Sequence, residues 1–384
     1  MYYVGLDVGD TCSSVEILDS CGQRVKHGEI EGRWPVVLDR IEKEVPRPFA
    51  ICFEASCGYG YLYERLRGMA QQVQVGHPGR LRLIFQSKRK NNRIDAEKLA
   101  KLLYLGEVPR AHVPKAEVRS WRATIEWRES LLRKRVAAKN QVRALLKSQG
   151  MHAPEAIGSL WSKKGLKWLR NVELAEGEAL CRDMLIGQLE HLSEQMGRVE
   201  RYLKKVSDGQ PAVALLRTIP GIGIRTAEAF VAYVDDIERF ARIKCVSSYF
   251  GVVPRQDASG KVNRLGHITK DGPPTVRKLL IEGAWQGIRH SPTIRAFFER
   301  VKAEDPDRRK IALVATGHYL IRVMAAMLRS GECWRHEEKR ILRRQGQDHG
   351  QNAARQQDCG WAAGQMKGFS PPEDTVAESQ CLLR

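Results

Sequence analysis

Metal-binding cysteine motifs and uninterrupted membrane-spanning runs are both missing from this sequence of 384 residues. Its nine cysteines include no C-x-x-C pair, which argues against a structural zinc site and fits a cytosolic protein. The most apolar stretch, residues 311–328, is interrupted by His318 and Arg322, so it predicts a buried helix rather than a membrane span. We expect no signal peptide, because the N-terminus runs directly into a predicted strand.

Acidic residues are also scarce relative to basic ones. The chain has 64 Lys and Arg against 45 Asp and Glu, which gives a net charge of +19 and a pI near 9.7. Residues 335–384 hold eight basic and seven acidic residues, so nearly all of the excess belongs to the first 334. A charge of this size indicates a polyanionic partner, and nucleic acid is the expected one.

The basic residues gather in two runs. Pro78–Arg110 contains nine basic and three acidic residues, and Arg128–Lys147 contains seven and one. One such run is as often a solvated helix face as a binding surface, but two in succession beside candidate acids favour phosphate binding. The residues expected to contact nucleic acid here are Lys88, Arg89, Lys90, Arg93, Arg133, Lys134, Arg135, Lys139 and Arg143.

The first 105 residues predict a mixed α/β domain. Three strands (YYVGLDVGD, SSVEILD and GQRVKHGEI) precede a helix near residues 35–45. The strand FAICFEAS, the helix YLYERLRGMA, the strand QVQVGH and the helix IDAEKLAKLLYLG follow. Three strands, a helix and then alternating strands and helices indicate a ribonuclease-H-like domain over residues 1–105.

Residues 106–208 predict basic helices. One apolar stripe at helical spacing consists of Val118, Trp121, Ile125, Leu132, Val142 and Leu146. A second is spaced 4, 3, 4, 3, 4, 3 and consists of Leu185, Leu189, Leu192, Met196, Val199, Leu203 and Val206. Three heptads without a slip indicate a coiled coil, either a hairpin with the 118–148 helix or a seam between two subunits.

The remaining chain divides again. Residues 209–332 predict a compact, mainly helical domain, and residues 333–384 predict a disordered tail rich in Gln and Gly.

Three acids could hold a metal ion. Asp7 and Glu54 end predicted strands, where side chains converge on ligands in α/β sheets, and Asp95 opens a helix. Together they could bind Mg²⁺ for phosphodiester cleavage. The alternatives are a turn residue for Asp7 and a paired buried acid for Glu54. Asn92, one turn before Asp95, is either a further oxygen ligand or only a helix cap.

Two features of the C-terminal part could bind or attack phosphate. Gly221 and Gly223 in PGIG fit a helix-hairpin-helix whose backbone amides approach phosphate, although an ordinary helix connection is the alternative. Ser259 in QDASGKVNRLGHITKDG could attack a phosphodiester, although a serine before glycine is far more often only a turn residue. The cations near it are Lys261, Arg264, His267, Lys270 and Arg277.

Taken together, these motifs resemble the IS110 family of transposases over residues 1–332. GLDVGD, FEAS and NNRIDAEKLA resemble the RuvC-like nuclease domain of that family, and VRSWRATIEWRESLLRKRVAAKNQVRALL resembles its basic helical stretch. IPGIG, SYFGVVP, ASG, ITKDG and RKLL resemble its C-terminal transposase domain. The order and spacing of the motifs carry the resemblance, since none of them is decisive alone.

The resemblance implies a composite active site. Asp7, Glu54 and Asp95 match the first, second and fourth members of an Asp-Glu-Asp-Asp tetrad for Mg²⁺, and the third falls on Asn92. It also implies a nucleophilic serine, which falls on Ser259. Donor and target DNA, a structured noncoding (bridge) RNA and assembly into a homodimer or homotetramer are the implied partners, in the bacterial cytoplasm at the nucleoid.

Three other functions fit part of this pattern. A nucleic-acid-binding protein without chemistry would use the basic helices alone, and a RuvC-like junction nuclease would use the acids without the serine. GLDVGDTCSSVEILD also resembles the first phosphate loop of actin-like ATPases and sugar kinases. That class needs a second Asp-x-Gly loop and a Gly-rich adenosine loop, which the sequence lacks.

Overall fold

The structure, a computed structural model, describes residues 1–85, 92–259 and 262–334, with the backbone alone at Asn92, Arg93 and Val262. The predicted tail beyond Trp334 therefore lies outside the described residues.

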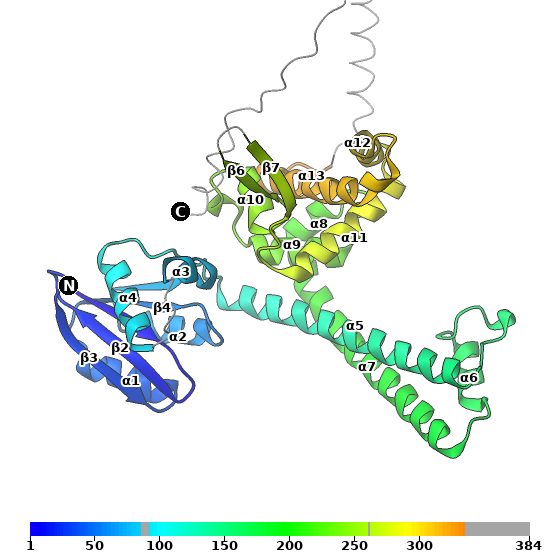
Figure 1. Cartoon of the computed structure of the whole chain (residues 1–384), viewed down its shortest axis with the longest axis horizontal. Helices are drawn as coiled ribbons and strands as arrows, with labels where there is room; N and C mark the ends of the chain where they lie inside the picture. Colours follow the sequence, from blue (N-terminus) through cyan, green and yellow to red (C-terminus); the bar gives the residue numbers. More distant parts are fainter. Residues whose placement is uncertain (86–91, 260–261, 335–384) are drawn as a thin grey trace, which may run out of the picture. The chain divides into compact units, whose positions relative to one another are not determined.

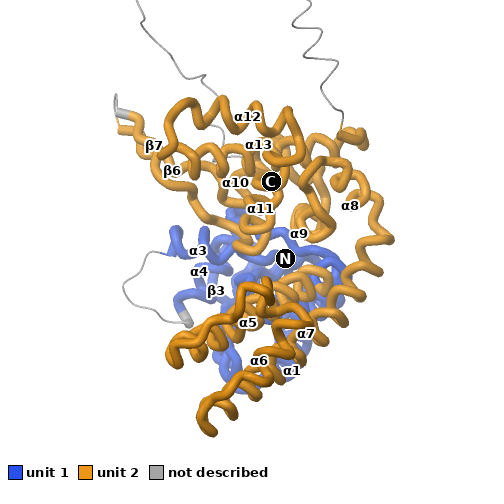
Figure 2. Tube along the Cα trace, turned by 90° about the vertical axis from the view of Figure 1, so that its right-hand side faces the viewer, with its two compact units in different colours: residues 1–119, 380–384 blue, residues 120–379 orange. Residues whose placement is uncertain are grey.

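The described chain forms two compact units. The first covers residues 1–119 and the second begins at Ser120 (Figures 1 and 2). The division into three domains with boundaries at 105 and 208 stays a prediction.

The first unit is a mixed sheet with helices packed on it. Its elements are β1 (Tyr2–Asp7), β2 (Cys12–Leu18), β3 (Arg24–Glu31), α1 (Trp34–Glu44), β4 (Phe49–Glu54), α2 (Tyr59–Leu66), β5 (Gln72–Gly76), α3 (Pro78–Ile84) and α4 (Asn92–Tyr104). The strand order is β3-β2-β1-β4-β5. β1, β2 and β3 are antiparallel neighbours, whereas β4 runs parallel to both β1 and β5. The expected α/β arrangement is confirmed.

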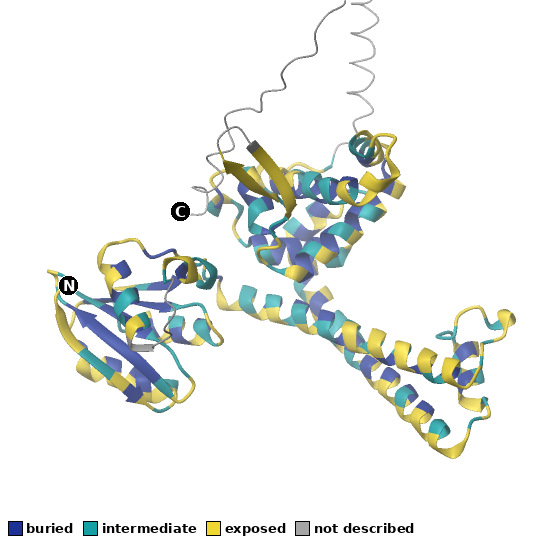
Figure 3. Cartoon of the chain, viewed as in Figure 1, coloured by how far each residue is buried: buried dark blue, intermediate teal, exposed yellow. Residues whose placement is uncertain are grey.

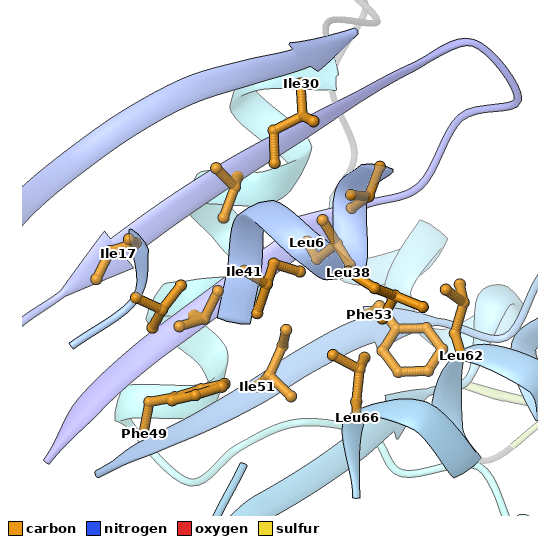
Figure 4. Packing of buried hydrophobic residues seen from close by; sticks show 14 of the residues in the cluster. Leu6, Ile17, Ile30, Leu38, Ile41, Phe49, Ile51, Phe53, Leu62 and Leu66 are labelled. Atoms are coloured by element: carbon orange, nitrogen blue, oxygen red, sulfur yellow. The ribbon is translucent and has the colours of Figure 1, made fainter. Parts of the chain in front are cut away.

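One face of this sheet carries the main hydrophobic core. Leu6, Ile51 and Phe53 point to that face because alternate residues of a strand share a side. Leu38 of α1 and Leu62 of α2 pack against them, as Figure 4 shows. Ala50 and Cys52 alternate with Ile51 and Phe53 along β4, so they point to the opposite face of the sheet, where they pack against α4.

Helix α4 lies very close to β1. A Cβ atom at Gly5 would lie 2.1 Å from the carbonyl oxygen of Ala96 and 2.4 Å from the amide nitrogen of Ala100. At the other end of the contact, the rings of Tyr3 and Tyr104 meet edge to face at 5.3 Å. Since Tyr104 lies beside Tyr3 and Ala96 beside Gly5, α4 runs antiparallel to β1. Its first turn therefore points to the end of β1 that carries Asp7.

The close approach at Gly5 leads to a stability prediction. We expect Gly5→Ala to push α4 away from β1 and to cost about 1–3 kcal/mol, the usual range for overpacking a core. Hydrogen exchange of the α4 amides in the full chain should then become about 5- to 150-fold faster.

Gly28→Ala is the matched control for this prediction. Gly28 lies in the same sheet, on β3, and an added Cβ meets no atom within 4 Å. Exchange in α4 should stay at its parental rate in this control. Equal exchange in both variants would contradict the packing argument.

The second unit is mainly helical. Its elements are α5 (Ala116–Ser148, which begins in the first unit), α6 (Lys163–Asn171), α7 (Glu176–Asp208), α8 (Pro211–Leu216), α9 (Ile224–Val234), α10 (Ile243–Tyr249), β6 (Pro254–Ser259), β7 (Val262–Ile268), α11 (Pro274–His290), α12 (Pro292–Lys302) and α13 (Arg309–Ser330). Short 3₁₀ turns lie at Glu155–Ile157, Ile237–Arg239 and Pro306–Arg308.

Helices α5 and α7 form an antiparallel hairpin (Figure 1). Leu131 of α5 packs against Leu192 and Met196 of α7 in one cluster, and Val142 packs with Leu189 in another. The heptad stripe of α7 is therefore buried against its own chain, which realises the hairpin alternative. Figure 3 shows buried and exposed residues alternating along both helices, as expected for amphipathic helices.

A polar cluster fixes the base of the hairpin to the C-terminal helices. Glu126 accepts hydrogen bonds of 2.7 Å from the Tyr233 hydroxyl and of 2.7 Å from the Thr275 hydroxyl. Lys278 donates to Glu129 at 2.8 Å. Burial, and then the hydrogen bond to Glu126, raises the pKa of Tyr233, so its hydroxyl remains a donor. The Arg122 guanidinium donates to the carbonyl oxygens of α9.

Helix α13 is the apolar helix noted in the sequence. Among the described residues, the segment 306–330 alone is long and apolar enough to cross a membrane. Residues such as Leu320, Ile321 and Met324 are fully buried against neighbouring helices of the second unit. The segment is thus placed as a core helix, in agreement with the prediction.

Candidate active site and nucleic-acid interface

Asp7 and Glu54 end two neighbouring parallel strands. Leu6 pairs with Phe53 in the register of β1 and β4, and each acid is the next residue of its strand. Paired residues of adjacent strands lie about 4.8 Å apart and point to the same side of the sheet. Since Leu6 and Phe53 face the main core, Asp7 and Glu54 face the side of α4. Both are partly exposed.

Asp95 approaches the same edge from the helix. It lies in the first turn of α4, the turn that points to the end of β1, and its side chain is 28% exposed. The ammonium of Lys98 lies 3.9 Å from its Oδ1 atom and 4.9 Å from the centre of the Phe85 ring. Lys98 was not predicted as a site residue, although its spacing of three from Asp95 places it on the same helix face.

Carboxylate oxygens, the donors that Mg²⁺ prefers, lie at this edge, and the predicted magnesium site stays a prediction. Within the described residues, no three His, Cys, Asp or Glu side chains stand close enough together to hold a metal ion. Mg²⁺ does not need such a cage, because it commonly binds through one or two carboxylates together with waters and substrate phosphates. Asn92 begins α4, and its side chain, like that of Arg93, lies outside the described part.

The loop after Asp7 is held tightly. Trp34 donates from its ring nitrogen to the carbonyl oxygen of Gly9 at 3.2 Å, and the Ser13 hydroxyl accepts from the Gly9 amide at 3.2 Å. A Cβ atom at Gly9 would lie 2.1 Å from the Cys12 carbonyl oxygen. The turn therefore requires glycine there, and it fixes the backbone two residues beyond Asp7.

Ser259 lies at the end of an exposed two-stranded ribbon formed by β6 and β7 (Figure 3). In the ribbon register Ser259 pairs with Val262 and Asp257 pairs with Arg264. Residues two apart on a strand share a face, so Arg264 and Asp257 lie on the same side of the ribbon as the serine. Arg264 thus keeps its predicted place near Ser259, whereas Lys261 lies outside the described residues.

The base of the ribbon is closely packed. Gly251 has a φ of +63°, and a Cβ atom there would lie 2.2 Å from the Asp271 carbonyl oxygen. Arg277 donates to the carbonyl oxygens of Asp271, Gly272 and Phe250. Partial burial lowers its pKa. Arg277 therefore holds the base of the ribbon together, and its contact with nucleic acid stays a prediction, as does that of the exposed Lys270.

The PGIG segment joins α8 to α9 in a tight turn. Gly221 has a φ of +89°, and a Cβ atom there would lie 2.2 Å from the amide nitrogen of Gly287 in α11. Packing against α11 already requires glycine at this position. Gly223 precedes the first residue of α9 and has no atom within 4 Å of an added Cβ, so its backbone is the more open of the two. Phosphate binding at this turn stays a prediction.

The predicted basic surface of α5 is present. Lys139 and Arg143 lie over the Trp161 ring, with their charged groups 4.8 Å and 5.4 Å from its centre. Burial, and then the charges of Arg135 and Arg143, lowers the pKa of Lys139. Crowded cations of this kind favour a bound anion. Arg133 and the other predicted contacts of α5 lie on exposed or half-exposed positions. Lys88, Arg89 and Lys90 lie outside the described residues.

Two segments of the chain, one with the acidic residues and one with Ser259, each match a known protein family. Residues 4–150 match the transposase family DEDD_Tnp_IS110, and this stretch contains Asp7, Glu54, Asp95 and the basic part of α5. Residues 213–299, with PGIG and Ser259, match the "Transposase IS116/IS110/IS902 family". The chain belongs to the IS110 family of transposases. The predicted resemblance is thereby confirmed.

Individual relatives agree with membership of the IS110 family. The transposase for insertion sequence element IS1111A of Coxiella burnetii is 29% identical over 62% of this chain and 66% of its own length. The transposase for insertion sequence element IS1328 of Yersinia enterocolitica is 29% identical over 62% of this chain and 70% of its own length. A "Probable family 20 transposase" of Pseudomonas aeruginosa is 25% identical over 86% of this chain and 98% of its own length.

Proposed function

We propose that this chain is an RNA-guided DNA recombinase that cuts and rejoins DNA through a covalent serine–phosphate link. The observation that carries the proposal is the pairing of Asp7 with Glu54 at the ends of adjacent parallel strands, on the side from which α4 brings Asp95. The strand order β3-β2-β1-β4-β5 supports a RuvC-like, ribonuclease-H-like fold for this unit. Membership of the IS110 family supports DNA as the substrate.

The acids would hold the divalent cation. Asp7 and Glu54 would each provide a carboxylate oxygen, with waters and substrate phosphates as further ligands. Asp95 and the uncharged amide oxygen of Asn92 would join this ligand set in the DNA-bound assembly. When bound, Mg²⁺ would supply Lewis-acid stabilisation of the negative charge on the phosphate oxygens. Lys98 beside Asp95 adds a fixed positive charge to the same edge, which favours the approach of a DNA phosphate.

Ser259 would carry out the covalent step. Its Oγ atom attacks the scissile phosphorus, a Ser259–phosphate ester forms, and one bond from phosphorus to a deoxyribose oxygen breaks. The serine proton leaves to solvent or a base, and the departing deoxyribose oxygen takes up a proton. Attack by another deoxyribose hydroxyl on the ester rejoins DNA and releases Ser259. Arg264, on the same ribbon face, would stabilise charge on the phosphoryl oxygens.

The two groups of residues belong to different compact units of the chain. Their cooperation is therefore proposed for the assembled protein, a homodimer or homotetramer bound to donor DNA, target DNA and a structured noncoding RNA in the cytoplasm at the nucleoid. The basic surface of α5 would supply phosphate contacts for these partners, at Arg133, Lys139 and Arg143 among others.

Copurification and an adduct assay test this proposal. RNA carried by the purified chain should be a single structured species. With that RNA, Mg²⁺ and end-labelled DNA, the protein should form a covalent DNA adduct that survives boiling in detergent. Cleavage without an adduct would favour a junction nuclease instead, and binding without cleavage would favour a nucleic-acid-binding protein without chemistry.

Replacement of Asn92 gives a further prediction. Asn92→Asp restores a fourth carboxylate, so the four ligands carry four negative charges in place of three. We expect Mg²⁺-dependent cleavage at limiting Mg²⁺ to rise, by about tenfold for a gain of 1.4 kcal/mol in metal affinity. Asn92 is the first residue of α4 rather than its N-cap, and an acid in the first turn is favourable to the helix dipole, so we expect the start of α4 to be unchanged. Asn92→Ala is the opposite control, because it removes the amide oxygen, and we expect its Mg²⁺-dependent cleavage to be lower than that of the parent. Equal cleavage by Asn92→Asp and the parent would show that the amide is no defect.

A further inference from the structure

The hairpin of α5 and α7 carries a cavity at its base that none of the site residues above uses. Its volume is about 550 Å³, and it is a shallow cavity that is largely open to solvent. Residues at one-turn spacing on each helix line it, among them Ser120, Thr124 and Trp127 of α5 and Gln195, Arg198 and Tyr202 of α7. One face of each helix therefore contributes to a single open cavity.

Two large aromatic side chains line this cavity and remain exposed. Trp127 is 50% exposed and Tyr202 is 47% exposed, although the hairpin offers buried positions one turn away. The free energy of hydrating apolar ring surface is unfavourable, so exposed aromatic rings in a cavity indicate a ligand with a flat face. Nucleobases have such a face and stack on aromatic rings regardless of sequence.

Two cations lie beside the exposed aromatic rings of the cavity. The Lys134 ammonium is 5.2 Å from the centre of the Trp127 ring, which brings a cation directly to the aromatic surface. Arg198 is exposed, and within the described residues it forms no ion pair with a carboxylate. A strand whose base entered the cavity would therefore meet positive charge on both helices.

The walls of the cavity are held in place before any ligand binds. On α5 the neighbouring face docks on the C-terminal helices through Glu126 and Glu129. Across the hairpin, Arg128 of α5 forms an ion pair of 2.8 Å with Glu200 of α7. A preorganised cavity loses less conformational entropy on binding, which increases affinity.

We propose that this cavity binds one unpaired nucleobase of the RNA partner. The inference rests on the RNA partner of the proposed function. RNA is favoured over DNA because a folded RNA displays unpaired bases in loops and bulges, whereas duplex DNA keeps its bases stacked. The Ser120 hydroxyl lines the cavity and could bond to a base edge or a ribose 2′-hydroxyl. The Thr124 hydroxyl donates to the Ser120 carbonyl oxygen at 2.9 Å, so it could only accept a hydrogen bond from the ligand.

A fluorescent base tests stacking directly. The probe is a single-stranded RNA 12-mer with 2-aminopurine at its centre between uridines, mixed with the full-length chain. We expect the parent and Trp127→Phe to quench the probe, because both keep an aromatic face. Trp127→Ala and Tyr202→Ala should lose the quenching and weaken the Kd roughly 5- to 150-fold, the range for one base stack. Leu180→Ala is the control, since this exposed α7 residue does not line the cavity.

Arg198→Gln separates phosphate contact from stacking. This substitution should weaken RNA binding and reduce the slope of log Kd against log salt concentration by about one, the value for one phosphate contact. Quenching of the probe at saturation should stay at the parental level. Equal Kd and quenching in Trp127→Ala and the parent would overturn the proposal. A duplex DNA with 2-aminopurine at a paired position that showed the same Trp127-dependent quenching would overturn the assignment to RNA. A changed oligomeric state in Trp127→Ala with unaltered RNA binding would assign the cavity to contacts between copies.

Failure of the cavity proposal can be distinguished from failure of the proposed recombinase function. Ser259→Ala should abolish the DNA adduct and keep the quenching, because the serine ribbon does not line the cavity. A parent chain that bound no RNA at all would overturn both the RNA partner and the cavity assignment.

Discussion

Ser259→Ala is expected to abolish the covalent protein–DNA adduct and to lower strand cleavage by about 10³-fold or more. Removal of a catalytic nucleophile leaves only the acceleration that binding and electrostatics provide. Gel electrophoresis of end-labelled DNA after denaturation, with guide RNA and Mg²⁺ present, measures both effects. DNA affinity should remain parental, because one exposed hydroxyl adds little to binding of a polyanion by a chain of net charge +19.

A displaced hydroxyl is the matched control. The double variant Ser259→Ala with Ala258→Ser keeps a serine on the ribbon but moves it to the other face, since successive residues of a strand point to opposite sides. We expect this variant to form no adduct. An adduct from Ser259→Ala would assign the nucleophile to another residue, and an adduct from the double variant alone would show that the face of the ribbon is not decisive. Cleavage by the parent without any adduct would favour the junction nuclease.

Glu54→Gln and Asp7→Asn are expected to lower cleavage by about 10²–10³-fold each. Each substitution keeps the size of the side chain and removes one of two charges that lie on adjacent strands. A loss of about 3–4 kcal/mol in transition-state stabilisation corresponds to this change in rate. Cleavage measured over a range of Mg²⁺ concentrations should show a raised Mg²⁺ requirement as well as a lowered rate.

Glu29→Gln controls for the loss of negative charge alone. Glu29 lies on β3 in the same row of the sheet, because it pairs with Ser14, which pairs with Asp7. Two strand spacings, about 10 Å, separate it from Asp7. We expect parental cleavage and a parental Mg²⁺ requirement in this control. Similar losses in all three variants would mean that the acids act through the overall charge of the domain.

The end of β4 could be located from the sequence because its apolar run stops at an acid. Phe49, Ile51 and Phe53 face one core and Ala50 and Cys52 face another, so the run FAICFEAS predicted a buried strand ending near Glu54. The neighbour of that strand could not be predicted, since pairing of β4 with β1 depends on contacts across the whole sheet. The adjacency of Asp7 and Glu54 therefore emerged only from the fold.

Other features were ambiguous in the sequence for a physical reason. The heptads of α7 bury the same stripe against α5 or against a second subunit, and their spacing is identical in both cases. Gly221 was assigned to phosphate approach, but the backbone of Gly287 occupies the space beside it. Arg277 was assigned to nucleic acid from its charge, whereas its position relative to three carbonyl oxygens depends on the folded loop. The Trp127 cavity had no sequence signal beyond an aromatic residue directly before the basic run Arg128–Lys147.

Under the proposed function, in which Ser259 attacks DNA, the ribbon of β6 and β7 has an energetic consequence for DNA binding. An isolated two-stranded hairpin is only marginally stable in water, and all six residues of β6 are exposed. Its firm attachment lies at the base, where Gly251 and Arg277 pack, and not along the strands. Fixing the ribbon against a substrate therefore costs conformational entropy, which is subtracted from the affinity for DNA. At an incorrect DNA site the ribbon would form fewer contacts, and these would not offset the conformational entropy lost when it is ordered. The ordering of the ribbon would therefore favour binding to the correct DNA site.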